Sequence, residues 1–185
     1  MSVADPRDEL VEHLPAMRAF AISLTRNSSV ADDMVQDTLV KAWTNIEKFK
    51  AGTNMRAWLF TILRNTYYSN RRKSKREVAD VDGVITENLA EKPAHDGHMQ
   101  MADFRRALAK LSDEQREALL LVGASGFSYE EAAGMCGVAV GTIKSRINRA
   151  RTHLAELMGH GADDSLEITD DATMSVISAS KVSSF

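Results

Sequence analysis

The stretch Gly126 to Leu157 reads GFSYEEAAGMCGVAVGTIKSRINRARTHLAEL and decides the fold of the C-terminal half of the chain. Ser128 is a typical helix N-cap, and the acids that follow it suit the positive end of a helix dipole. The helix can be only about two turns long, because Gly137 supplies the left-handed backbone that a tight turn needs. We therefore predict a short helix from Ser128 and a turn near Gly137-Val138.

A longer helix is predicted from Thr142 onward, because apolar residues recur there at intervals of three and four. The side expected to be buried holds Ile143, Ile147, Ala150, Leu154 and Leu157. The opposite side carries hydroxyl, amide and cationic groups, and no acid lies between Thr142 and Thr152. Such groups read base edges and phosphates in a DNA major groove. The two helices therefore predict a DNA-binding helix-turn-helix; the alternative is an ordinary surface helix with a solvated basic face.

Composition places the chain among soluble globular proteins of one or two small domains, with 185 residues, 44% apolar and 26% charged. The chain contains no apolar run of membrane-spanning length, and its N-terminus lacks the apolar segment of a signal peptide. The single cysteine cannot form an internal disulfide, which fits a reducing compartment. We therefore expect a cytoplasmic protein without a membrane partner.

Residues that could support catalysis or bind a metal are sparse. The five histidines do not combine with cysteine or acids at metal-ligand spacing, and only His95 and His98, in a polar stretch, come close. The sequence shows no Gly-rich phosphate loop and no pair of nucleophile and base. We therefore predict neither a metal nor a cofactor, and a protein that is not an enzyme.

The formal net charge is −3, which alone argues against a DNA-binding protein, but the charges are segregated along the chain. Met55 to Arg76 contains cations and no acid, whereas residues 77–99 and 161–185 are mainly acidic. Basic segments thus alternate with acidic connectors, and the basic segments are the ones expected to bind DNA.

Two helices are predicted before the basic segment, over residues 5–26 and from Ala31 to about Glu47, with a cap at Asn27-Ser28-Ser29. The outer face of the second helix carries Asp32, Asp33, Gln36, Asp37 and Val40. Acids near a helix start commonly serve as partners of the helix dipole, which accounts for Asp32 and Asp33. The other three indicate a docking surface for a basic partner.

A third helix is predicted from Met55 to about Arg72, with Trp58, Leu59, Ile62, Leu63 and Thr66 on its buried side. Its outer side is expected to carry Arg56, Arg64, Asn65 and Tyr68. Aromatic rings stack on bases, amides read base edges and cations bind phosphates. This face, with the Gly-containing loop before it, therefore predicts a site for single-stranded or flipped bases.

The remaining segments complete an all-α fold of two small helical domains. Residues 77–99 are rich in acids, Gly and Pro, which predicts a flexible acidic linker, with a short helical turn near Val84 to Leu89 as an open alternative. After it, one helix is marked by Met101 to Leu111, and a capping box of Ser112 and Gln115 opens the next.

The predicted boundaries are a first domain over 5–76, the linker over 77–99, a helix-turn-helix domain over 100–159 and a tail over 160–185. The tail is expected to be disordered or to serve as a docking segment.

The two halves together resemble a sigma factor of the extracytoplasmic-function class, the two-domain bacterial transcription initiation factors. Residues 32–43, DDMVQDTLVKAW, resemble the segment that docks on the clamp helices of RNA polymerase in this family. Phe49 to Asn65, FKAGTNMRAWLFTILRN, resembles the loop and helix that melt and read the −10 element. Gly141 to Arg151, GTIKSRINRAR, resembles the −35 recognition helix. Three motifs in the family's order are more specific than any one alone.

The resemblance implies a role for each matching position. Polymerase docking is expected at Asp32, Asp33, Gln36, Asp37 and Val40. The −10 site is expected at Lys50, Thr53, Asn54, Met55, Arg56, Arg64, Asn65 and Tyr68. The −35 contacts are expected at Thr142, Lys144, Ser145, Arg146, Asn148, Arg149 and Arg151, where Arg146 and Arg151 hold phosphates or pack.

The second domain is most similar to the general-stress-response sigma factors of alphaproteobacteria, in its residues 111–151. This resemblance implies a protein that directs RNA polymerase core to −35/−10 promoters of a stress regulon and assists strand opening. It also implies sequestration by a small anti-sigma protein. No cofactor is implied, and the partners are polymerase, promoter DNA and the anti-sigma protein.

Two alternative functions remain at the level of sequence. One is a sigma-like mimic that titrates an anti-sigma factor without binding DNA, although such mimics carry a phospho-receiver domain with a βα pattern that this sequence does not show. The other is a dimeric helix-turn-helix repressor, which the first domain disfavours because its cationic aromatic helix suits melted DNA.

Overall fold

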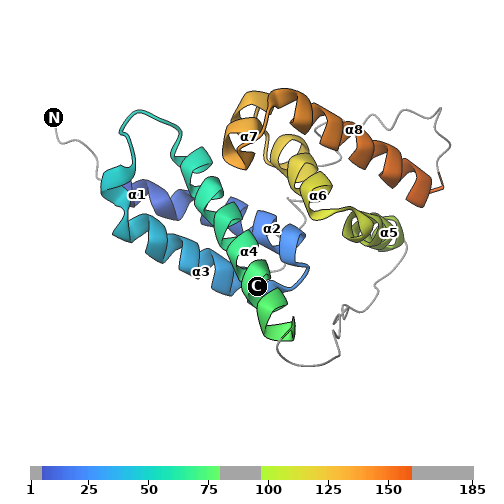
Figure 1. Cartoon of the computed structure of the whole chain (residues 1–185), viewed down its shortest axis with the longest axis horizontal. Coiled ribbons are helices and arrows are strands. Elements are labelled where there is room, and N and C mark those ends of the chain that lie inside the picture. Colours follow the sequence, from blue (N-terminus) through green and yellow to red (C-terminus); the bar gives the residue numbers. More distant parts are fainter. Residues whose placement is uncertain (1–5, 80–96, 160–185) are drawn as a thin grey trace.

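A computed structural model of the chain describes the backbone of residues 6–79 and 97–159. These residues form two groups of helices that lie side by side (Figure 1). Within the described ranges every regular element is a helix, which confirms the predicted all-α fold. The tail over 160–185 and the helical turn considered near Val84 to Leu89 lie outside the described residues.

The N-terminal unit contains six helical elements. They are α1 (Pro6–Glu9), η1 (Leu10–His13), α2 (Leu14–Thr25), α3 (Ser28–Thr44), η2 (Ile46–Lys48) and α4 (Met55–Ala79). The single helix predicted over residues 5–26 is therefore wrong, because a 3₁₀ turn interrupts it before α2. The physical reason is Pro15, which lacks a backbone N–H and clashes with the preceding turn inside a helix, and which the first turn of α2 tolerates.

Two boundaries of this unit follow from local chemistry. The side chain of Asn27 accepts a hydrogen bond from the backbone N–H of Val30 at 3.1 Å and so caps α3, as predicted. Helix α4 runs to Ala79, well past the predicted end at Arg72 and into the predicted linker. Its exposed end is rich in helix-forming Lys and Arg, and Lys73 pairs with Glu77 one turn later, so no local signal stops the helix.

The C-terminal unit also contains the predicted helix-turn-helix. Its elements are α5 (Gly97–Lys110), α6 (Asp113–Leu119), the π-helical stretch η3 (Leu120–Ala124), α7 (Tyr129–Cys136) and α8 (Val140–Leu157). Capping boxes open both α6 and α7, at Ser112 and Ser128 respectively. Gly137 ends α7 with φ +66°, the left-handed conformation that the turn requires. The recognition helix α8 begins two residues before the predicted Thr142.

The apolar stripes lie where the sequence periodicity places them. On α8, Ile143, Ile147, Ala150 and Leu154 are buried, and Leu157 packs against the same core. In the N-terminal unit, α2, α3 and α4 pack against one another around large buried side chains such as Met17, Leu24, Met34, Leu59 and Leu63. Each unit therefore has a core of its own.

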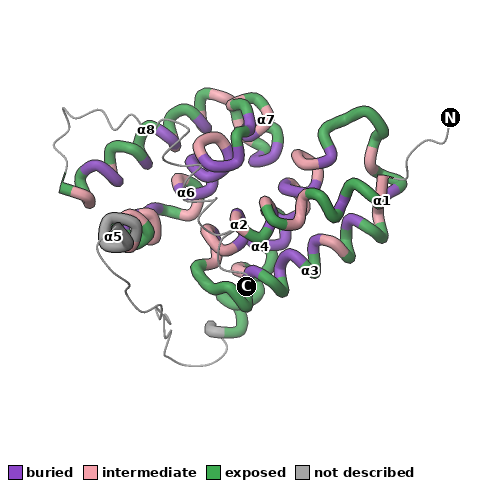
Figure 2. The backbone as a smooth tube through the Cα atoms, turned by 180° about the vertical axis from the view of Figure 1, so that it is seen from behind, coloured by how far each residue is buried: buried purple, intermediate pink, exposed green. Residues whose placement is uncertain are grey.

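The two units also pack on each other, with α4 against α7 and α2 against α6 (Figure 1). The fully buried ring of Phe60 lies 5.1 Å from the ring of Phe20 in its own unit and 5.1 Å from the ring of Phe127 in the other. Buried segments of both units face this contact (Figure 2). The apolar core is thus continuous across the boundary.

Two further properties hold for the described residues. None of their helices is both apolar enough and long enough to cross a membrane. Within the same ranges, His, Cys, Asp and Glu side chains nowhere gather in a group of three that could hold a metal ion.

We expect Ser128→Ala to lower the free energy of unfolding by about 1 kcal/mol, because the backbone N–H of Glu131 loses the hydroxyl that accepts its hydrogen bond at 3.1 Å. Denaturant unfolding followed by circular dichroism measures the loss. Ser145→Ala is the matched control, since Ser145 is exposed on α8 and its change should stay within about 0.5 kcal/mol. Equal stability of the two variants would contradict the capping role.

Candidate nucleic-acid and polymerase interfaces

Helix α8 presents a polar surface that carries the predicted −35 contacts. Lys144, Ser145, Asn148, Arg149 and Arg151 are exposed, whereas Thr142 and Arg146 are half-buried. The ammonium group of Lys144 lies 5.7 Å above the ring of Tyr129 on α7, which steadies it at the start of the surface. Hydroxyl, amide and guanidinium groups therefore stand free on one helix, as major-groove reading requires.

A shallow polar hollow lies beside this surface, lined by Ser112, Glu114, Gln115, Arg146 and Arg149. The exposed Arg149 and the half-buried Arg146 thus both face the start of α6.

The outer face of α3 is the second predicted surface, and it is open. Asp33, Gln36, Asp37 and Val40 are exposed. Asp32 is also exposed but occupied, since its carboxylate accepts hydrogen bonds from the Arg18 guanidinium at 2.6 and 3.2 Å. The hydrogen bond from Arg18 lowers the pKa of Asp32, and the charge of Arg18 acts in the same direction. Asp33, Gln36 and Asp37 are therefore the freer polar groups of this face.

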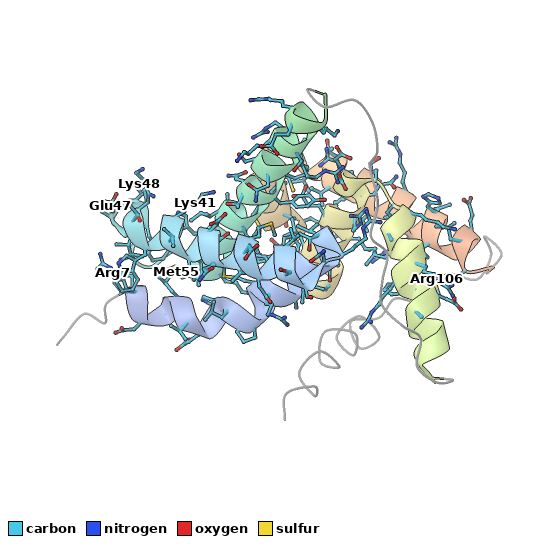
Figure 3. All side chains as sticks on the ribbon, turned by 90° about the horizontal axis from the view of Figure 1, so that it is seen from below. Arg7, Lys41, Glu47, Lys48, Met55 and Arg106 are labelled. Atoms are coloured by element: carbon cyan, nitrogen blue, oxygen red, sulfur yellow. The ribbon has the colours of Figure 1, made fainter. Side chains whose placement is uncertain are left out.

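An apolar groove adjoins these polar groups, and Val40 is the one residue of its lining that was predicted for the docking site. It is lined by Leu39, Val40, Trp43 and Thr44, and the Trp43 side chain is 55% exposed. Arg7 lies 5.1 Å above the Trp43 ring, at the end of the N-terminal unit far from the C-terminal unit (Figure 3). An exposed tryptophan beside acids is a signal that the sequence did contain, within the segment that resembles the docking motif.

Some of the residues predicted for the −10 site are exposed to solvent, whereas others are buried or contact the C-terminal unit. Lys50, Thr53, Asn54 and Asn65 are exposed, and the loop before α4 is tightened by a hydrogen bond from the Thr53 hydroxyl to the Lys50 carbonyl at 2.7 Å. Met55 is only 1% exposed and belongs to the core. The structure thus makes Met55 a packing residue in this arrangement.

The exposed Asn54 and the half-buried Arg56 both contact the C-terminal unit. The Asn54 side-chain amide donates to Glu131 Oε1 at 2.9 Å, while its oxygen caps α4 at the backbone N–H of Ala57. The guanidinium of Arg56 lies 5.3 Å from the ring of Phe60 and 4.8 Å from the ring of Phe127. Burial lowers the pKa of Arg56, and the carboxylate of Glu131 opposes this shift.

Arg64 and Tyr68 meet a buried carboxylate. Glu117 has no exposed surface, and its Oε1 lies 2.6 Å from Arg64 Nε, while the Tyr68 hydroxyl donates to Oε2 at 3.2 Å. Burial raises the pKa of Glu117, and the charge of Arg64 offsets this only in part. Burial disfavours the charge of Arg64, but Glu117, Cys136 and Tyr68 together outweigh this effect, so the pKa of Arg64 is raised. The ion pair of Arg64 and Glu117 thus places two opposite charges at the contact between the units.

Two arginines complete the contact between the units. Arg71 Nη1 lies 2.5 Å from Asp113 Oδ2, and the Tyr67 hydroxyl donates to the same carboxylate at 3.2 Å. Arg116, which is 3% exposed, donates to the carbonyls of Leu24 at 3.2 Å, Leu108 at 3.1 Å and Leu111 at 2.9 Å. It thereby joins the ends of α2 and α5.

Four residues of the C-terminal unit contact α4 or the residue before it and were not predicted to do so, namely Asp113, Glu117, Phe127 and Glu131. Glu131 was predicted only as one of the acids in the first turn of its helix, and Asp113 was given no role. Glu117 gave no signal, because a single Glu in a helix is ordinarily solvated and its burial depends on Arg64, far away in sequence.

Comparison with known proteins now identifies the family. Residues 10–77 match Sigma-70 region 2, and residues 101–154 match Sigma-70, region 4. The chain is 55% identical over 159 residues to the ECF RNA polymerase sigma factor EcfG of Rhodopseudomonas palustris (strain TIE-1), which covers 85% of this chain and 88% of that protein. This chain belongs to the ECF sigma factors of RNA polymerase. The family predicted from sequence is confirmed.

Two solved structures of sigma factors agree in fold with this chain. The sigma factor RpoE of Bartonella quintana, solved in complex with the anti-sigma factor NepR, is 56% identical, with a TM-score of 0.77 over 85% of this chain and 98% of that one. The structure of CnrH with the cytosolic domain of CnrY is 28% identical, with a TM-score of 0.60 over 82% and 86% of the two chains. The similarity to general-stress sigma factors predicted from sequence is thereby confirmed.

Proposed function

We propose that this ECF sigma factor brings bacterial RNA polymerase core to promoters with −35 and −10 elements of a stress regulon and helps to open the DNA strands. Promoter DNA and core polymerase are its partners, and the cytoplasm is its compartment because both partners are there. The observation that carries the proposal is the presence of two open surfaces, on α3 and α8, on far sides of the molecule (Figure 1).

The surface of α8 would read the −35 element. Lys144, Ser145, Asn148 and Arg149 are free to contact base edges, with Arg146 and Arg151 directed to phosphates or to packing. The face of α3 would dock on the clamp helices of polymerase through Asp33, Gln36, Asp37 and Val40, assisted by the apolar groove at Trp43. Asp32 would join the docking surface once its hydrogen bond with Arg18 is replaced by a contact with polymerase.

Recognition and opening of the −10 element would use the loop before α4 and the outer face of α4. Lys50, Thr53, Asn54 and Asn65 are exposed polar groups on one edge, and Arg56, Arg64 and Tyr68 add cations and a ring. Unstacking costs a few kcal/mol per base, so this chain would capture a small number of bases while polymerase supplies the other contacts. Met55 would contribute by holding the loop on the core.

Regulation by a small anti-sigma protein is part of the proposal. Two ECF sigma factors of similar fold were solved with anti-sigma partners, RpoE with NepR and CnrH with the cytosolic domain of CnrY. A second candidate function is a sigma-like mimic that titrates an anti-sigma factor. The exposed, acid-poor face of α8 favours a sigma factor that binds DNA over the mimic. A mimic that binds only an anti-sigma protein does not require such a face.

Run-off transcription tests the proposal. Core polymerase that lacks any sigma factor, mixed with this chain and a library of randomised promoters, should yield transcripts whose templates share two conserved elements. Omission of the chain is the control. A mimic would yield no transcript while still binding an anti-sigma protein, and this result would reject the sigma function.

We expect Arg149→Ala to weaken binding of the selected promoters by about 1–3 kcal/mol and to relax base choice at one −35 position, because its exposed guanidinium suits a guanine edge. Repeated promoter selection with the variant measures the change. Glu156→Gln is the control, as it alters charge on an exposed part of the same helix. An equal loss on every promoter would instead make Arg149 a phosphate contact.

We expect Asp37→Arg to reduce affinity for core polymerase, because it reverses a charge on the exposed docking face of α3. The fold should persist, since the Asp37 side chain is exposed. Binding to immobilised core enzyme measures the effect, with circular dichroism as the check on folding. Glu47→Arg, on the nearby turn η2, is a matched exposed reversal outside the docking face. Unchanged affinity for Asp37→Arg would remove α3 from the docking surface.

A further inference from the structure

Tyr129 and Lys144 lie on the two helices of the helix-turn-helix and contact each other. Tyr129 is the first residue of α7, Lys144 lies in the second turn of α8, and the two helices pack together (Figure 1). Lys144 Nζ is 5.7 Å from the centre of the Tyr129 ring, which is within the range of a cation–π interaction. Within the described residues, Lys144 is the one lysine that lies over an aromatic ring.

The ring of Tyr129 is held in place from two sides. The backbone N–H of Ser128 donates to Glu131 Oε2 at 2.9 Å, and the backbone N–H of Glu131 donates to Ser128 Oγ at 3.1 Å. This capping box fixes the turn from which Tyr129 emerges. Tyr129 is also half-buried and packs against the hydrophobic core. The ring is therefore the fixed partner, and the exposed side chain of Lys144 is the one that can move.

A lysine by itself distinguishes poorly between the acceptors of a DNA duplex. Its ammonium group is a compact charge on a flexible stem, and it lacks the planar fork with which arginine recognises a base edge in one orientation. An unrestrained lysine on a DNA-facing helix can bind a phosphate as well as the O6 and N7 acceptors of guanine. Base recognition by Lys144 therefore requires a group outside its own side chain to set its direction.

A neutral ring can set this direction while the lysine keeps its positive charge for DNA. A carboxylate would also hold the ammonium group, but its opposite charge would weaken the attraction of Lys144 for the acceptors on a base. The first acid of α8 is Glu156, which is several turns beyond Lys144. The attraction of the Tyr129 ring comes from its quadrupole and adds no net charge to the surface.

We propose that Tyr129 is a positioning residue for −35 recognition, and that its ring directs the ammonium group of Lys144 to a guanine edge. The inference rests on the proposed −35 role of α8. It gives α7 a part in base choice, in addition to supporting the helix that enters the major groove. Tyr129 acts through Lys144 and does not itself contact a base.

Loss of the ring and loss of the lysine should have different consequences. Without the ring, Lys144 keeps its charge and can bind a nearby phosphate, so affinity for duplex DNA of any sequence should persist. The preference for one base at the position that Lys144 reads should fall. Without the ammonium group, both the affinity and the base preference should fall. The two variants therefore separate specificity from affinity.

The test uses holoenzyme assembled from core polymerase and the full chain, on a promoter selected in the run-off experiment. Each −35 position is changed to each of the other bases, and competition binding measures the preference for the selected base. Tyr129→Leu, which keeps an apolar side chain for the core, should lower this preference at one position about two- to fivefold, as expected for a cation–π contact at an exposed site. Affinity for random duplex should change by less than about twofold.

Tyr129→Phe is the matched control, because phenylalanine keeps the ring and removes only the hydroxyl group. It should retain the base preference of the wild-type chain. Equal losses in Tyr129→Phe and Tyr129→Leu would assign the effect to the hydroxyl group and overturn the inference. Thermal unfolding followed by circular dichroism checks that the variants fold alike. If Tyr129→Leu is unfolded, Tyr129→Met, which is apolar and unbranched, takes its place.

A double-mutant cycle with Lys144→Met distinguishes positioning from packing. Methionine keeps an unbranched stem and removes the ammonium group. In this background Tyr129→Leu should leave the base preference unchanged, because there is no ammonium group left to direct. If Tyr129→Leu lowers the preference by the same factor with and without the ammonium group, the ring acts through the fold of α7 and the inference is wrong.

Failure of the positioning role can be told apart from failure of the proposed function. Run-off transcription by the wild-type holoenzyme shows whether the chain acts as a sigma factor, and Lys144→Met shows whether Lys144 reads a −35 base. If both give the expected result and Tyr129→Leu keeps the full base preference, the sigma function stands and the positioning role is rejected. If Lys144→Met alters no base preference, the positioning role fails together with the −35 assignment of Lys144, while run-off transcription still tests the sigma function.

Discussion

The ion pair of Arg64 and Glu117 is the contact on which the arrangement of the whole molecule depends. Glu117 is fully buried, and a carboxylate in that position is tolerable only with a cation beside it. The cation comes from the other unit, so the burial of Glu117 and the packing of the two units require each other. The rings of Phe60 and Phe127, which meet edge to face, supply the apolar part of the same contact.

This contact has different consequences for the three binding surfaces. The proposed docking face of α3 and the proposed reading face of α8 lie away from this contact and are exposed. Arg56, Arg64 and Tyr68 instead lie at the contact between the units, where they meet Phe127 and Glu117. A two-unit protein can therefore leave two of its proposed binding surfaces open and cover the third.

Most helices could be predicted from the sequence because caps and turns that act within a few residues determine where a helix begins and ends. The capping box at Ser112, the N-cap at Ser128 and the left-handed Gly137 each act within a few residues, and the structure places all three as expected. Where the helix prediction was wrong, a competing local effect had been overlooked, as with Pro15 in α2. The π-helical stretch after α6 has no comparable signal in the sequence.

The sequence by itself determined the all-α fold, the sigma family and the free faces of α3 and α8, because periodicity and motif spacing set which side of a helix is polar. Only the tertiary structure decided that Met55 is core and that Arg64 and Tyr68 are covered. The outward side of an isolated helix is not necessarily exposed, since a second unit can bury it. That burial depends on residues such as Glu117, whose partner is distant in sequence and close only after folding.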